Sequence, residues 1–275
     1  MEDVRGRLLA PEVRLLTLTG PGGTGKTRLA LQAAADLIEE FEDGIFFVVL
    51  ATLTDPALVA SSVAQVLGVR ESADQPLLEG IKDYLQDKRL LLVLDNFEQV
   101  LEAAPLAGEI LSAAPHLEVL ATSRIPLGIY GEREYAVPPL AIPDPKHLPG
   151  LEALSQYEAV RLFIERAEAT KAGFEITSEN APAVAEICAR LDGLPLAIEL
   201  AAARIKLLPP SAILARLSNR LKLLTGGARD LPERQRTLKA PLSGATRSSR
   251  KARRRCSPGW QFSRGAHAGG RGGGL

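Results

Sequence analysis

Residues 20–27 read Gly-Pro-Gly-Gly-Thr-Gly-Lys-Thr, and no other stretch limits the fold of this chain as strongly. The octet fits the pattern G-x-x-x-x-G-K-[ST] with Gly20, Gly25, Lys26 and Thr27 in register. Glycines permit positive φ and carry no Cβ, so several backbone N–H groups can turn towards one chain of phosphates. In such a loop the lysine reaches the β- and γ-phosphates and the threonine offers its hydroxyl to Mg²⁺. The octet therefore predicts a phosphate-binding loop, called the phosphate loop below.

The residues on either side supply the context that this pattern needs. Residues 13–19 are apolar and β-branched, which predicts a buried strand, and residues 26–41 carry apolar side chains at helical spacing. A helix that begins at the loop adds the positive end of its dipole to the phosphate site. The alternative, a glycine-rich turn of an α/β protein without a ligand, explains neither the full motif nor its flanks.

Strands and helices alternate through the first half of the chain. Further strands are predicted at 45–50, 90–94, 117–122 and 133–137, with helices at 55–67, 76–86 and 97–114, the last kinked or broken at Pro105. This alternation is typical of an α/β fold, a parallel sheet flanked by helices, and we assign it to residues 1–137. A linker with five prolines follows at 138–150, and four helical patterns at 155–170, 182–191, 194–207 and 210–217 predict a small all-helical domain over 151–225.

The charges divide the chain unevenly. Of its 275 residues, 241–275 hold eight Lys/Arg and no Asp/Glu, whereas the rest carry 25 basic and 33 acidic groups. The acidic body gives no reason to expect nucleic-acid binding. The tail lacks an apolar period and is expected to be disordered. It is either a basic, nucleic-acid-binding extension or, as we favour, the product of a reading frame shifted near residue 240.

Cysteine and histidine offer little chemistry. Cys188 and Cys256 have no metal-ligand spacing, and Cys188 lies in an apolar stretch, so we expect it in the core. The three histidines, His116, His147 and His267, are scattered. The first residues do not resemble a signal peptide, and no apolar run is long enough for a membrane span, so we expect a cytoplasmic protein.

A second element of the site is predicted at residues 90–95, where five apolar residues end in Asp95. This is the Walker B pattern, and an Asp at the carboxyl end of a buried strand faces the crevice where open α/β sheets bind ligands and can hold Mg²⁺. The next residue is Asn96, an amide that can position a water but cannot accept its proton, which predicts slow turnover. Glu98 could substitute for the missing carboxylate, but we favour a solvated carboxylate at a helix start.

A third element is Arg124, which follows the strand at 117–122. If that strand lies beside the other two, its carboxyl end places Arg124 within reach of a γ-phosphate, where a guanidinium can pair with two oxygens. The alternative is a surface arginine at a strand end.

Five segments in this order carry a resemblance to a known family: GPGGTGKTRLAL, LLLVLDNFEQV, ATSR, GLPLAIELAAAR and LLTGGARDLPERQRTL. Over residues 12–239 the chain resembles the STAND class of signalling ATPases, specifically the bacterial NB-ARC-like module of LuxR-type and SARP-type transcriptional regulators and of cyclase-linked ATPases. The resemblance implies ATP or ADP and Mg²⁺ as ligands, with the strand at 117–122 lying between those of the phosphate loop and of Asp95. It also implies that Pro195 contacts adenine, that Arg124 senses the γ-phosphate, and that the module is a switch that can self-associate with ATP.

The expected residue roles follow from these motifs. Catalytic roles are expected of Lys26, Asp95, Asn96 and Arg124. Mg²⁺ ligands are expected from Thr27 and Asp95. Nucleotide binding is expected from Gly20, Gly22, Gly23, Thr24, Gly25, Lys26, Thr27, Arg28 and Pro195.

The end of the chain departs from the family. Relatives continue into a winged-helix domain, whose start we place at 226–240, whereas residues 241–275 do not resemble it. We therefore expect the effector and sensor domains of full-length relatives to be absent here. The function expected is a regulatory nucleotide switch with slow Mg-dependent ATP hydrolysis. The alternatives are a non-hydrolysing nucleotide-binding scaffold, an inactive fragment and, less compatible with the charges, a protein that binds nucleic acid through its tail.

Overall fold

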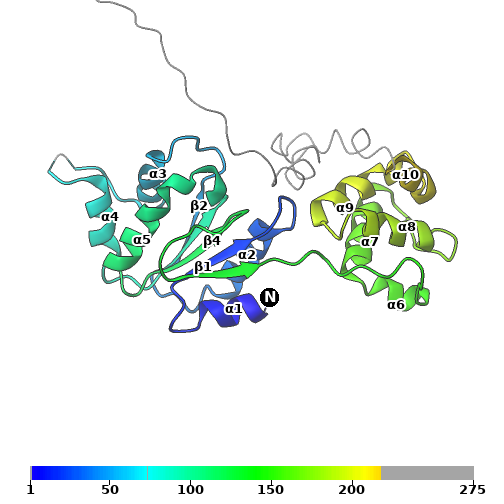
Figure 1. The fold of residues 1–275 in the computed structure, drawn as a ribbon, viewed down its shortest axis with the longest axis horizontal. Helices are drawn as coiled ribbons and strands as arrows, with labels where there is room; N and C mark the ends of the chain where they lie inside the picture. The colour runs from blue at the N-terminus through cyan, green and yellow to red at the C-terminus, as the bar shows by residue number, and fades with distance from the viewer. Residues whose placement is uncertain (1, 73, 218–275) are drawn as a thin grey trace, which may run out of the picture.

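The computed structural model describes residues 2–72 and 74–217, which form a helix-covered sheet and a separate group of helices (Figure 1). The predicted winged-helix start at 226–240 and the tail at 241–275 lie outside the described residues, as do Cys256 and His267. Within the described ranges, no helix combines the length and the apolar character needed to cross a membrane.

The sheet has five parallel strands in the order β2-β3-β4-β1-β5. Their bounds are β1 Leu15–Thr19, β2 Ile45–Val49, β3 Leu91–Asp95, β4 Glu118–Thr122 and β5 Glu132–Ala136. All five predicted strands are present. β4 lies between β3 and β1, which confirms the strand order that the family resemblance implies.

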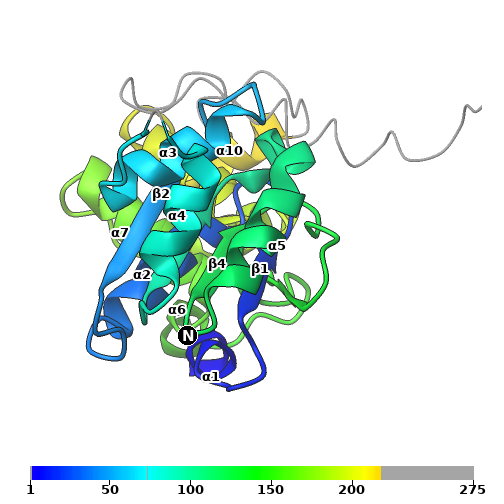
Figure 2. The same ribbon diagram turned by 90° about the vertical axis from the view of Figure 1, so that its left-hand side faces the viewer.

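Two layers of helices cover the sheet, because successive side chains of a strand point to opposite faces. Leu91 and Val93 of β3 pack in a core with α1 (Glu2–Leu8) and α2 (Lys26–Asp36). Leu92 and Leu94 pack on the other face, under the second layer of helices, which Figure 2 views from the front. That layer consists of α3 (Leu58–Leu67), α4 (Leu77–Leu85) and α5 (Ala104–Ala113). Burial on both faces explains why β3 is continuously apolar.

The structure corrects two local predictions. The helix α1, which buries Val4 and Leu8, has no counterpart among the predicted elements. The helix predicted from residue 97 was wrong in its start: two 3₁₀ turns, η1 (Phe97–Gln99) and η2 (Leu101–Ala103), come first. Pro105 then lies in the first turn of α5, where its missing N–H leaves no helical hydrogen bond unmade.

The remaining helices have an apolar core of their own, whose members run from Leu140 to Leu217. The helices are α6 Leu151–Ser155, α7 Glu158–Thr170, α8 Ala181–Arg190, α9 Pro195–Ala202, η3 Ala203–Lys206 and α10 Pro210–Leu217. Cys188 lies in this core, as predicted, and burial raises the pKa of its thiol to about 12. A segment between β5 and α6 connects the two parts (Figure 1).

Candidate functional site

The phosphate loop joins the carboxyl end of β1 to the first turn of α2, as predicted. Gly20, Gly23 and Gly25 have φ angles of 143°, 88° and 91°. L-amino acids with a side chain rarely adopt these angles, so the backbone itself accounts for the three glycines. The hydroxyl of Thr24 donates to the carbonyl oxygen of Pro21 at 3.0 Å and closes the turn.

Lys26, the first residue of α2, folds back over the loop. Its Nζ donates to the carbonyl oxygens of Gly20 and Pro21, at 2.7 and 3.0 Å. The residue is only 7% exposed, and this burial lowers the pKa of the ammonium below its ordinary value. The negative charge of Glu98 opposes that shift, Arg124 adds to it, and Asp95 opposes it more weakly than Glu98. The lysine thus lies among the charged groups of the predicted site.

Asp95 ends β3 and contacts two hydroxyl groups. Thr27 on α2 donates to its Oδ1 at 2.6 Å, and Thr122 on β4 donates to the same oxygen at 2.7 Å. The three meet because parallel strands end at one edge of a sheet and α2 begins at that edge. Thr27 and Asp95 are the two residues predicted to hold Mg²⁺, whereas Thr122 was not predicted, because it is a neighbour of Asp95 only when β4 lies beside β3.

The backbone turns sharply after Asp95. Asn96 has a φ of 64°, and its N–H donates to the hydroxyl of Thr122 at 2.9 Å. Its side-chain Nδ2 donates to Oε1 of Glu98 at 3.2 Å, and Nε of Arg124 lies 3.3 Å from the same oxygen. The Glu98 side chain is 9% exposed, so the expectation of a solvated carboxylate was wrong. Burial follows from the turn, which directs the side chain back towards the sheet edge.

Arg124 lies at the carboxyl end of β4 and reaches the phosphate loop. A Cβ built on Gly22 would lie 3.5 Å from a terminal nitrogen of Arg124. The guanidinium therefore lies between the loop and Glu98, at the edge of the sheet where the sequence placed it.

The helical part also reaches the loop. The N–H of Leu196, in the first turn of α9, donates to the carbonyl oxygen of Gly23 at 3.2 Å. Cγ of Pro195 lies 3.9 Å from the position of a Cβ on Gly25. Pro195 opens α9, where a proline needs no hydrogen-bond donor. The segment that carries the resemblance thus lies against the phosphate loop.

The structure brings most of the predicted residues together at this edge. Arg28 is exposed on the first turn of α2. The residues that line or adjoin the loop are Gly20, Gly22, Gly23, Thr24, Gly25, Lys26, Thr27, Asp95, Asn96, Arg124 and Pro195.

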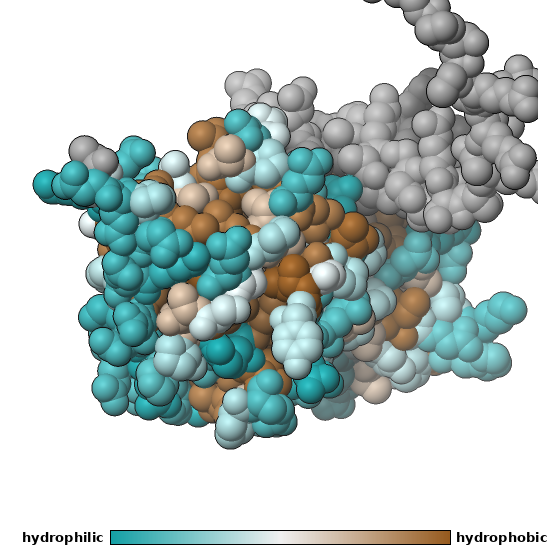
Figure 3. Space-filling view, turned by 60° about the vertical axis from the view of Figure 1, so that its left-hand side comes forward, coloured by the Kyte–Doolittle hydropathy of each residue, from teal (hydrophilic) through white to brown (hydrophobic). Residues whose placement is uncertain are grey.

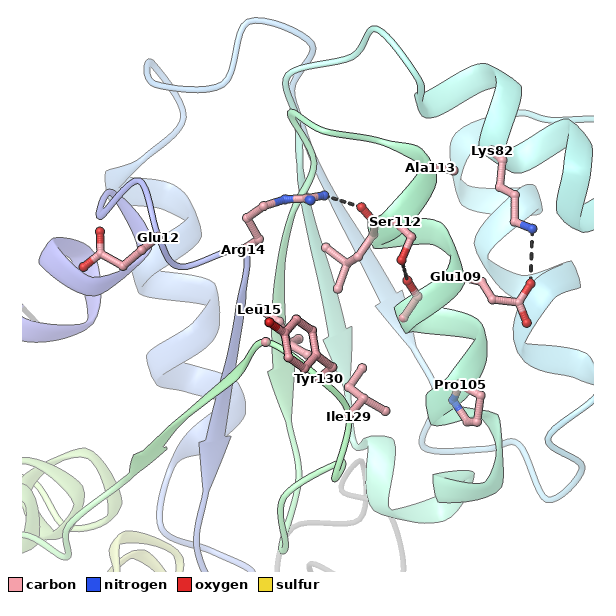
Figure 4. A pocket seen from close by; sticks show the side chains of 13 residues that line it. Glu12, Arg14, Leu15, Lys82, Pro105, Glu109, Ser112, Ala113, Ile129 and Tyr130 are labelled. Atoms are coloured by element: carbon pink, nitrogen blue, oxygen red, sulfur yellow. Dashed lines mark hydrogen bonds and ion pairs between the residues drawn. The ribbon is translucent and has the colours of Figure 1, made fainter.

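A hollow of about 940 Å³ lies elsewhere, at the amino end of β1 beside α5 (Figure 4). Arg14 donates there to the carbonyl oxygens of Leu111 and Ala114, and Tyr130 faces the same hollow from the loop before β5. On the side that Figure 3 shows, apolar side chains gather across the middle, with hydrophilic side chains around them. The hollow contains none of the predicted site residues.

Comparisons with known proteins agree with this geometry. Residues 1–124 match the NB-ARC domain family. This chain is 43% identical, over 237 residues, to a Mycobacterium tuberculosis protein that is named a putative HTH-type transcriptional regulator. The aligned part covers 86% of this chain but only 25% of that protein. Regulatory protein AfsR of Streptomyces griseus is 29% identical over 215 residues, covering 74% of this chain and 20% of AfsR.

The similarity to one solved structure bears on the fold and not on the function. Cdc6p from Pyrobaculum aerophilum has a TM-score of 0.51 and 17% identity, over 84% of this chain and 70% of that one. The ordered motifs, the strand order and the family match agree, and residues 1–124 therefore carry an NB-ARC domain.

Proposed function

We propose that this module binds ATP or ADP with Mg²⁺, hydrolyses ATP slowly and acts as a nucleotide switch in signal transduction or transcriptional regulation. One observation carries the proposal: side chains from α2, β3 and β4, and the start of α9, converge on one phosphate loop. The proposed organisation is a nucleotide-binding domain at 1–137, a linker at 138–150 and a helical domain at 151–225, of which residues 218–225 lie outside the described part of the chain.

The residues present suit a magnesium nucleotide. The hydroxyl of Thr27 and the carboxylate of Asp95 lie 2.6 Å apart, and oxygen donors of this kind are the ligands that Mg²⁺ prefers. Bound Mg²⁺ would neutralise phosphate charge. The Lys26 ammonium pairs with β- and γ-phosphates in this proposal, exchanging its bonds to the loop carbonyls for charge-assisted ones.

The contact between α9 and the loop supports a switch. Pro195 and Leu196 lie against the same glycines that would surround the phosphates, so a nucleotide that moves the loop also changes its contact with α9. A ligand shifts such an arrangement only by the difference in its affinity for the two poses. In this proposal ATP and ADP differ through the γ-phosphate contact of Arg124, and Pro195 contacts the adenine.

Lys26→Ala tests the site. We expect Mg-ATP at about 100 times its Kd to stabilise the native protein by about 2.7 kcal/mol, and the variant to lose this gain. Thermal unfolding with and without Mg-ATP measures it. Lys146→Ala, at an exposed lysine far along the chain from the loop, is the matched control and keeps the gain. An unchanged shift in Lys26→Ala would refute the site.

A second candidate is a scaffold that binds nucleotide without turnover, which Asn96 favours because an amide accepts no proton from water. Single-turnover hydrolysis with excess protein over labelled ATP separates the two. A rate equal to that of buffer, together with an intact ATP-induced thermal shift, would leave only binding.

A further inference from the structure

We propose that Glu98 is the catalytic base of ATP hydrolysis and that Arg124 holds its carboxylate until a γ-phosphate binds. The inference rests on the function proposed above. It assigns to Glu98 the role of proton acceptor, which Asn96, the residue directly after Asp95, does not fill. It is carried by the path of the backbone from Asp95 to Glu98 and by the surroundings of the Glu98 carboxylate.

The path of the backbone carries the Glu98 carboxylate to the site, where residue 96 is an asparagine and supplies none. The left-handed φ of Asn96 turns the chain, and its N–H is anchored on Thr122 of the next strand. Phe97 follows with no exposed surface and fixes the turn in the core beneath α5. The 3₁₀ turn η1 then points the next side chain back at the site, where it meets Arg124.

The Glu98 carboxylate has one occupied oxygen and one open one. Asn96 and Arg124 both contact Oε1, whereas Oε2 is buried and accepts no hydrogen bond from any residue in the described ranges. A buried carboxylate oxygen without a donor is unfavourable in a purely structural role, and such groups concentrate at functional sites. The arginine that contacts Oε1 of Glu98 also reaches Gly22, so the carboxylate lies one side chain away from the phosphate loop.

The chemistry assigned to Glu98 is general base catalysis. Oε2 accepts a proton from water while the water oxygen forms a bond to the γ-phosphorus of ATP. The bond between that phosphorus and the β–γ bridging oxygen breaks, and the electron pair leaves with ADP. The proton on Glu98 then returns to solvent, so the products are ADP and inorganic phosphate.

Arg124 regulates this step through its contact with the carboxylate, since its Nε lies 3.3 Å from Oε1 of Glu98. When Arg124 turns to a γ-phosphate, this contact breaks and the carboxylate can meet the attacking water. The same side chain thereby links recognition of the γ-phosphate to activation of the water. Asn96 orients the carboxylate through Oε1 and needs no proton acceptor of its own.

The competing explanation is that Glu98 only positions Arg124. Glu98→Gln distinguishes the two, because the amide oxygen still accepts hydrogen bonds but takes no proton. We expect single-turnover hydrolysis to fall by about 10²- to 10⁴-fold while the Mg-ATP thermal shift remains. The protein should also retain intact ATP rather than ADP after incubation and desalting, measured by chromatography of the released nucleotide.

Two variants accompany it. Glu102→Gln makes the same change at an exposed residue one turn further on and leaves hydrolysis unchanged. Glu98→Asp keeps a proton acceptor and retains more turnover than Glu98→Gln. Unchanged hydrolysis in Glu98→Gln would overturn the inference alone, as would loss of the ATP-induced shift together with hydrolysis, which indicates a structural role. If the wild type does not exceed Lys26→Ala in hydrolysis, the proposed ATPase function fails and the inference with it.

Discussion

The backbone N–H of Leu196 donates to the carbonyl oxygen of Gly23 at 3.2 Å, and this bond ties the first turn of α9 to the phosphate loop. The two residues are also in close contact, since a Cβ on Gly23 would lie 3.0 Å from the Cβ of Leu196. Gly23 therefore meets two requirements. It adopts a φ of 88°, and it leaves room for the helix that crosses the loop.

Gly23→Ala is expected to lower the free energy of unfolding by about 1–3 kcal/mol, because the new methyl group is strained by the backbone and crowds Leu196. Gly22→Ala is the matched control. Gly22 has no positive φ, and the atoms nearest to its Cβ would belong to the guanidinium of Arg124, from 3.5 Å. Urea unfolding of both variants measures the difference. Equal losses in the two would show that neither α9 nor the φ of Gly23 matters.

Much of this site was predictable because it depends on local pattern and on one rule of topology. The octet, its flanking strand and its helix specify the phosphate loop from neighbouring residues alone. Asp95 and Arg124 follow from the rule that parallel strands end at a common edge, and the structure places both there.

Other features were not predictable from local pattern. The contact of Thr122 with Asp95 requires β4 beside β3, an arrangement that the family resemblance implies but that the chain order of the strands does not reveal. The burial of Glu98 depends on the left-handed backbone of Asn96, a conformation that asparagine permits but does not require. An acid after a strand ordinarily indicates a solvated helix start, and only the anchored turn overrides that pattern.

Thr122→Val should destabilise the protein by about 1–3 kcal/mol. The substitution keeps the shape of the side chain but removes the donor to Asp95 and the acceptor for the N–H of Asn96, both in a buried place. It should also weaken the Mg-ATP thermal shift, because Asp95 loses a partner that fixes its orientation.

Thr17→Val provides the control for Thr122→Val. Thr17 lies on β1 and is as fully buried as Thr122, but its hydroxyl has no hydrogen-bond partner within the described part of the chain. Replacing that hydroxyl by a methyl group is expected to be neutral or stabilising. Urea unfolding should therefore show a loss of stability in Thr122→Val and none in Thr17→Val, and equal destabilisation of the two variants would contradict this expectation.

Glu118, at the start of β4, should make stability depend on pH. Burial raises the pKa of its carboxyl from the ordinary value of 4.5 to about 7, although the charges of Arg89 and Arg14 oppose the shift. The folded protein therefore holds this proton more tightly than the unfolded chain. The contribution of the protonated Glu118 carboxyl to the free energy of unfolding is fully present below pH 4.5 and is lost as the pH rises through about 7.

Glu118→Gln tests this pH dependence, because the amide does not ionise. At pH 8 the variant should be more stable than the wild type by on the order of 1 kcal/mol, a value kept small because solvent screens a partly exposed group. Between pH 5 and 8 the free energy of unfolding of Glu118→Gln should fall less steeply than that of the wild type. Glu102→Gln, at an exposed site, leaves the wild-type profile in place. Parallel profiles for wild type and Glu118→Gln across this range would show that the buried carboxyl does not take up a proton on folding.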